Sequence, residues 1–119
     1  MKRLFPTAGL GRCGATVVDG YVYAVAYDPI DTQGIASQSK NTFQELDRRL
    51  KKAGSHKDSL IQVTVYLSDI SNKAEMDKVW CEWMGPDESN WPQRACVGVQ
   101  LAKGCLIEVV VIAKAKDNG

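Results

Sequence analysis

The chain has 119 residues, 45% of them hydrophobic and 24% charged, and a formal net charge of +1 at pH 7. These values are ordinary for one soluble globular domain whose core needs no disulfide or metal. The basic residues are dispersed, which argues against a nucleic-acid or membrane-surface partner. No apolar run has the length of a membrane span, and Met1-Lys2-Arg3 lacks the apolar core of a signal peptide, so we expect a cytoplasmic protein.

The cysteines show no metal-binding pattern. Cys13, Cys81, Cys96 and Cys105 form no C-x-x-C pair, and the single histidine, His56, is not spaced to join them as a zinc ligand. We therefore predict that the protein has no metal site and that its thiols are free and mostly buried.

The N-terminal third predicts a β-hairpin. Residues 1–11 carry little core content, and a strand is expected from Gly14 to Asp19. Asp19-Gly20 is a type I′ turn signal, because glycine tolerates the positive φ that this turn needs. The return strand, Tyr21 to Tyr27, is apolar on both faces and should be covered on both. Helices can cover one face, and we expect the other to pack against a second copy of the chain.

A helix is predicted from about Gly34 to Ala53 and ends at Gly54. Its apolar stripe at helical spacing contains Ile35, Thr42, Phe43, Leu46 and Leu50. The charged residues Glu45, Asp47, Arg48, Arg49 and Lys51 are expected largely outside that stripe. We interpret the basic cluster as a solvated helix end, which the helix dipole favours.

A strand and a second helix come next. The segment from Leu60 to Ser68 alternates, and the alternation predicts one face made of Ile61, Val63, Val65 and Leu67. The helix from Asn72 to Met84 begins with an Asn72…Glu75 capping-box pattern and ends at Gly85-Pro86. Its apolar stripe contains Met76, Val79, Trp80 and Trp83, which we interpret as core packing.

The segment from Trp91 to Ala113 predicts two apolar strands joined by a tight turn at Lys103-Gly104. Two charged residues, Arg94 and Glu108, interrupt these strands. A buried charge is costly unless it is paired or meets a ligand, so they are candidate functional residues. An arginine fork is suited to a carboxylate, and a carboxylate can hold or activate a water molecule.

The spacing of the two charges decides how they can act together. If Leu101 pairs with Cys105 across the turn, Glu108 lies opposite Gly98, on the order of 13 Å from Arg94 along the strand. Should both serve one pocket, they would have to come from different subunits. The alternative is that each residue pairs with some other charge at an interface.

The predicted element order is β-β-α-β-α-β-β, an α+β arrangement in which both helices lie on one face of a mixed sheet. The segment R-A-C-V-G-V-Q-L-A-K-G-C-L-I-E-V-V-V-I-A resembles the C-terminal signature of the Rid family, the YjgF-type reactive intermediate deaminases. The D-G turn, the N-T-F-Q-E-L helix and the V-T-V-Y-L-S-D strand extend the resemblance over the whole domain, residues 1–119.

The resemblance implies a chorismate-mutase-like α+β fold, assembled as a homotrimer with three clefts between subunits. It also implies hydrolysis of small 2-iminoacids and their enamines, such as 2-aminoacrylate, to 2-oxoacids and ammonia, with neither metal nor cofactor. By position, Arg94 would bind the substrate carboxylate, backbone groups around Cys96 would contact the substrate, and Glu108 would position the attacking water. The Cys96 thiol itself is expected to be a small buried group rather than a nucleophile, since no histidine is near it in the sequence.

Two pocket positions depart from the deaminase pattern. Cys13 stands where the deaminase members have a tyrosine, which widens the pocket and removes a hydroxyl. Asp77 stands where they have an asparagine, and its carboxylate would repel an anionic substrate or favour a cationic one unless it faces elsewhere. The competing hypothesis is a non-enzymatic binder of small carboxylates such as 2-oxoacids in the same cleft.

Overall fold

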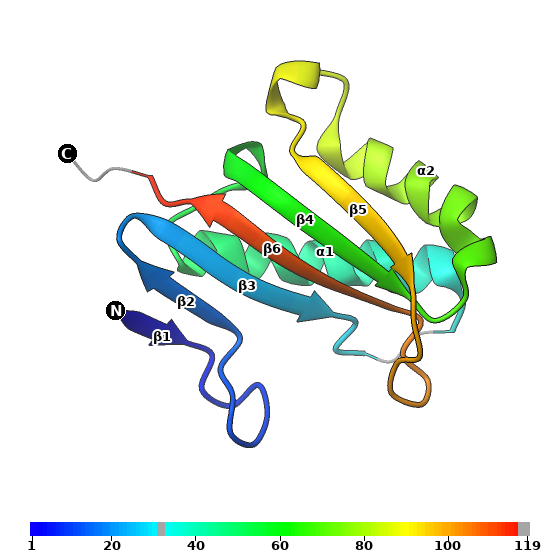
Figure 1. Ribbon diagram of the computed structural model, residues 1–119, viewed down its shortest axis with the longest axis horizontal. Helices are drawn as coiled ribbons and strands as arrows, with labels where there is room; N and C mark the ends of the chain where they lie inside the picture. The colour runs from blue at the N-terminus through cyan, green and yellow to red at the C-terminus, as the bar shows by residue number, and fades with distance from the viewer. Residues whose placement is uncertain (31–32, 117–119) are drawn as a thin grey trace.

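The computed structural model describes residues 1–30 and 33–116, which form a six-stranded sheet with two α-helices on one face (Figure 1). The strand order is β1-β2-β3-β6-β4-β5. Strands β4 and β5 are parallel and all other neighbours are antiparallel, which confirms the predicted mixed sheet. The elements are β1 (Lys2–Leu4), β2 (Ala15–Val18), β3 (Tyr21–Tyr27), α1 (Ile35–Lys52), η1 (Lys57–Ser59), β4 (Leu60–Leu67), η2 (Ile70–Asn72), α2 (Lys73–Met84), η3 (Glu88–Asn90), β5 (Gln93–Gly98) and β6 (Ile107–Lys114).

Strand β1 was not predicted. It pairs with β2, and its last residue, Leu4, is buried. Three residues are too few to show the two-residue period of a strand. The strand forms because it supplies hydrogen-bonding partners to the edge of β2, which would otherwise be unpaired. The hairpin after it is as predicted, with positive φ at both Asp19 and Gly20.

Strand β3 separates the two faces of the sheet. Val22, Ala24 and Ala26 are buried on the side of the helices, whereas Tyr21 and Tyr23 are exposed on the other side. We call this uncovered side the open face; its exposed apolar side chains include Tyr21, Tyr23, Val97 and Val110. The predicted cover of the first face is confirmed, and the packing of the open face against another copy remains a prediction.

The predicted hairpin of the last two strands is wrong. Strand β4 lies between β5 and β6, so Gly98 pairs with Leu67, and Glu108 pairs with Tyr27 and Tyr66. The turn at Lys103-Gly104 does form, with φ of 83° at Gly104. It belongs to a longer loop, because β6 inserts between β3 and β4 and gains a hydrogen-bonded neighbour on each side.

Helix α1 buries charges that the sequence analysis placed in solvent. Glu45 and Arg49 are only 7% and 6% exposed. Arg49 Nη1 donates a hydrogen bond to Val25 O at 2.6 Å, and its guanidinium lies over the rings of Phe5 and Tyr27. The solvated-end interpretation is therefore wrong for Arg49, whose partners come from distant parts of the sequence.

Two local predictions on β4 and α2 are also wrong. An irregularity between Leu60 and Gln62 takes Ile61 out of the alternation, and its side chain is exposed rather than aligned with Val63. Asn72 makes no capping hydrogen bond to α2, because η2 runs directly into the helix from Ile70.

The core lies between the sheet and the helices. Its largest fully buried side chains include Phe43, Leu46, Leu50, Val63, Val65, Leu67, Met76, Ile107, Val109 and Val111. All four cysteines are free, but Cys81 is exposed and the others are half-buried, so the prediction of mostly buried thiols is wrong. Among residues 1–30 and 33–116, no helix is long and apolar enough to cross a membrane, and no group of potential ligands is arranged to hold a metal.

Candidate functional site

Arg94 lies on β5, at the edge of the sheet, and its side chain is directed toward α2. Its Nη2 donates a hydrogen bond to Asp77 Oδ1 at 2.6 Å. Its guanidinium carbon is 5.1 Å from the ring centroid of Trp80, and Nη1 is 3.9 Å from Met76 Sδ. The arginine is therefore held between a carboxylate and an aromatic ring, as is favourable for a planar cation.

Asp77 is bound by two cations. Its Oδ2 accepts a hydrogen bond from Lys73 Nζ at 2.8 Å, one helical turn earlier, while Oδ1 binds Arg94. Burial raises the pKa of Asp77, but the hydrogen bonds and charges of Lys73 and Arg94 outweigh it and leave the pKa below its ordinary value. The three residues together carry one excess positive charge, which would attract an anion.

Cys96 lies two residues after Arg94 on the same side of β5 and packs against the core. Burial raises the pKa of its thiol, and Asp77 adds to this effect, whereas Arg94 and Lys73 oppose it. A raised pKa keeps the thiol protonated at neutral pH, and a protonated thiol is a poor nucleophile.

Glu108 lies near the start of β6 on the open face, since its neighbours Ile107 and Val109 are buried under the helices. Arg94 pairs with Val63 of β4, which pairs with Val111 of β6. Glu108 is three positions before Val111, so it lies two strands across and three residues along from Arg94. That separation is on the order of 14 Å, and the two side chains leave opposite faces of the sheet. Within one chain Arg94 and Glu108 do not meet.

Cys13 lies just before β2, on the far side of β3 and β6 from Arg94. Its Sγ is 3.6 Å from Thr16 Oγ1 and 3.5 Å from Ala15 O. It borders a hollow of about 330 Å³ on the open face, whose lining residues include Cys13, Thr16, Tyr23, Val25, Val110 and Ile112. Four strand spacings, roughly 19 Å, separate it from Arg94.

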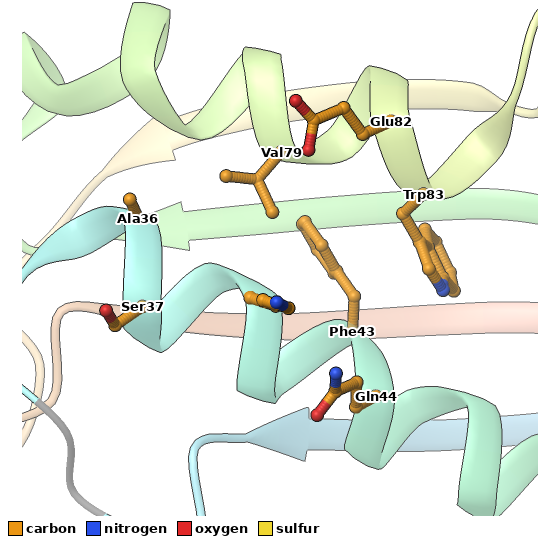
Figure 2. A pocket seen from close by; sticks show the side chains of 8 residues that line it. Ala36, Ser37, Phe43, Gln44, Val79, Glu82 and Trp83 are labelled. Atoms are coloured by element: carbon orange, nitrogen blue, oxygen red, sulfur yellow. The ribbon is translucent and has the colours of Figure 1, made fainter.

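A cavity of about 510 Å³ lies elsewhere, between α1 and α2. Figure 2 shows Phe43 directed from α1 toward Val79 and Trp83 of α2, with Glu82 at the rim. None of the five predicted site residues lines it. We place the candidate site at the β5 edge and the open face instead, because the ion pair of Asp77 with Arg94 lies at that edge. Lys40 and Glu82 line the groove between the helices but make no ion pair with any residue that the structure describes.

Two residues of the Arg94 cluster, Lys73 and Trp80, were not predicted as site residues. Lys73 stands four residues before Asp77, the spacing at which opposite charges on a helix meet, so a search for such pairs would have found it. Trp80 was interpreted as core packing, and its contact with Phe43 confirms that interpretation, with ring centroids 5.6 Å apart. The same indole also supports Arg94.

A mixed sheet with this strand order and both helices on one face is the α+β architecture expected from the resemblance. A solved structure of a YjgF protein family member from Neisseria meningitidis matches it with a TM-score of 0.88 at 25% identity, covering 98% of this chain and 95% of that one. The structure of yeast Mmf1 gives a TM-score of 0.83 at 27% identity, covering 98% and 96%.

Sequence comparisons agree with this architecture. A family model described as endoribonuclease L-PSP matches residues 15–115. A RutC family protein from Haemophilus ducreyi is 30% identical over 99 residues, which cover 82% of this chain and 83% of the relative. The mitochondrial protein MMF1 of Saccharomyces cerevisiae is 30% identical over 122 residues, covering 97% and 82%. The chain therefore belongs to the endoribonuclease L-PSP family, to which the names YjgF and RutC also refer, and the predicted relationship is confirmed.

Proposed function

We propose that the protein is a homotrimeric imine/enamine deaminase that converts small 2-iminoacids to 2-oxoacids and ammonia in clefts between subunits, without metal or cofactor. In this proposal Arg94 binds the substrate carboxylate and Glu108 positions water. Cys13 and the backbone around Cys96 border the substrate, and Asp77 adjoins its carboxylate. The cytoplasmic location expected from the sequence is part of the same proposal.

The placement of the site residues carries the proposal. Arg94 and Cys13 lie at opposite sides of the sheet, and Glu108 lies between them on the open face. That face exposes the apolar side chains of Tyr21, Tyr23 and Val110, and their contact with water is unfavourable. Packing open faces of several copies together would bury these side chains. It would also allow the β5 edge of one copy, which carries Arg94, to approach Glu108 of a neighbouring copy.

Hydrolysis of an imine needs few catalytic groups. A protonated imine is already an electrophile, so the main requirement is to hold it beside a water molecule. Glu108 accepts a proton as the water oxygen bonds to the imine carbon, and the imine nitrogen keeps the electron pair of the broken π bond. The resulting carbinolamine then loses ammonia, with cleavage of its C–N bond, and becomes the 2-oxoacid. Glu108 returns the proton to the departing nitrogen, and the hydroxyl oxygen gives up its own proton to Glu108 as the carbonyl double bond forms, after which that proton passes to the released ammonia.

The test generates 2-iminopropanoate from alanine with an amino-acid oxidase and times its disappearance with and without the protein. We expect acceleration by the unaltered protein and a loss of about 10- to 100-fold in Arg94→Ala, which removes a charge-assisted carboxylate contact. Glu108→Gln keeps the shape of the side chain but cannot accept the proton, so its rate should fall as well. No acceleration by the unaltered protein, or equal acceleration by Arg94→Ala, would refute the proposal.

The second candidate function is a non-enzymatic binder of 2-oxoacids. It is favoured by the local chemistry at Arg94, where the adjacent thiol of Cys96 has a raised pKa and the adjacent carboxylate of Asp77 is held by two cations. Neither group is free to act as a base. This function predicts that pyruvate raises the melting temperature while 2-iminopropanoate disappears at its uncatalysed rate.

A further inference from the structure

We propose that Asp77 is a specificity-determining residue: it occupies the Nη2 side of Arg94 as an internal carboxylate, and a ligand carboxylate that binds on that side must displace it. The proposal rests on the proposed function, in which Arg94 receives the substrate carboxylate. The cluster of Lys73, Asp77 and Arg94 then selects ligands with one negative charge over ligands with two.

Asp77 makes the contact with Arg94 that a substrate carboxylate would make. Its Oδ1 lies 2.6 Å from Arg94 Nη2, the distance of a strong charge-assisted hydrogen bond. A 2-oxo- or 2-iminoacid would present the same kind of oxygen to the same guanidinium. Asp77 occupies the Nη2 side of the guanidinium and Nη1 faces Met76 Sδ, so the internal carboxylate competes with any carboxylate that approaches the Nη2 side from solution.

The pair is accessible enough to exchange. The Arg94 side chain is 16% exposed and that of Asp77 is 32% exposed. An ion pair at such a partly solvated position contributes little net stability, so a ligand carboxylate can replace Asp77 as the partner of Arg94. The guanidinium keeps its support while this happens, because its contact with Trp80 does not involve Asp77.

Lys73 holds Asp77 near the site after the displacement. Its Nζ binds the second oxygen of Asp77 at 2.8 Å, so the displaced carboxylate stays close to Arg94. Two cations and one anion leave a single excess positive charge. One ligand carboxylate neutralises that charge, whereas a second negative charge would face Asp77 without a partner.

The experiment compares two ligands of equal chain length, 2-oxopentanoate with one charge and 2-oxoglutarate with two. Dissociation constants are measured by calorimetry at low salt for the unaltered protein, Asp77→Asn and Glu75→Gln. Glu75 is exposed on the same helix and makes no ion pair with any residue the structure describes, so Glu75→Gln makes the same charge change away from Arg94.

We expect Asp77→Asn to bind 2-oxopentanoate roughly fivefold more tightly and 2-oxoglutarate roughly twentyfold more tightly than the unaltered protein, because it removes the competitor and the repulsion together. Glu75→Gln should shift both constants by less than about twofold. Equal shifts in Asp77→Asn and Glu75→Gln, or equal tightening for both ligands, would overturn the inference.

Arg94→Ala separates this inference from the proposed function. If Arg94→Ala binds both ligands as the unaltered protein does, Arg94 is not the carboxylate site and the proposed function fails at its binding step. If Arg94→Ala loses binding while Asp77→Asn behaves like Glu75→Gln, the carboxylate site stands and only the role of Asp77 is wrong.

Discussion

Gly14→Ala should destabilise the protein through the contact that anchors the N-terminal segment to α1. A methyl group on residue 14 would lie 2.7 Å from Arg49 Nη1 and 2.9 Å from Phe5 Cβ. Both distances are shorter than any relaxed contact, so one of the neighbours must move. The Phe5 atom is next to the backbone, and the Arg49 guanidinium is buried and bound to Val25 O.

The size of the effect can be worked out from these two contacts. Extra volume in a well-packed region costs about 1–3 kcal/mol. Loss of the hydrogen bond from Arg49 would leave a buried donor unpaired, at a further cost of about 1–3 kcal/mol. Since relaxation of one contact partly relieves the other, we expect the free energy of unfolding to fall by about 2–4 kcal/mol.

Urea denaturation followed by circular dichroism, at one fixed protein concentration, measures this loss. The control is the same substitution made in an Arg49→Met background, where the buried guanidinium is gone. There Gly14→Ala should cost at least about 1 kcal/mol less, because only the contact with Phe5 remains. A loss below about 0.5 kcal/mol in the natural background, or an equal loss in both backgrounds, would refute the reasoning.

Three further changes test other parts of the structure. Val110→Glu places a charge in the middle of the open face and should shift the protein to monomers in sedimentation analysis; an unchanged mass would contradict the proposed assembly. Gln38→Leu removes the hydrogen bond that Gln38 Nε2 donates to Gly104 O and the one that Gln38 Oε1 accepts from Leu106 N, both 2.9 Å, and should lower the unfolding free energy by about 1–3 kcal/mol in urea denaturation. Cys96 should react with iodoacetamide more slowly than the exposed Cys81 at pH 7.5 and gain speed only at higher pH, because burial raises its thiol pKa; mass spectrometry of labelled peptides would reveal equal rates if this is wrong.

Features encoded locally were predicted well. The strand Tyr21–Tyr27 has the predicted bounds, because the Asp19-Gly20 turn fixes where it begins and its apolar residues continue until Asp28-Pro29. The pairing of β5 with β4 was not predictable in the same way. Two apolar strands around a tight turn have the local pattern of a hairpin. Strands β5 and β6 are not neighbours because β5 pairs with β4 and β6 pairs with β3 and β4, and those partners are distant in the sequence.

The candidate site shows the same division. Arg94 and Glu108 were identified because charge is unusual within apolar strands, and the structure agrees that they do not meet within one chain. The ion pair of Asp77 with Arg94 joins a helix and a strand 17 residues apart, so no local pattern pointed to it. Arg49 is a parallel case on α1, since its burial depends on Phe5 and Val25, which precede it by many residues.

The claim that one site is assembled from two subunits can be tested by complementation. Arg94→Ala and Glu108→Gln proteins are unfolded together in equal amounts, refolded into mixed oligomers, and assayed for hydrolysis of 2-iminopropanoate. If each site takes its arginine from one subunit and its glutamate from the next, about one quarter of the sites in a closed ring contain both natural residues, and the mixture should recover about one quarter of the natural activity. Activity no higher than that of the two separately refolded variants would contradict the shared site.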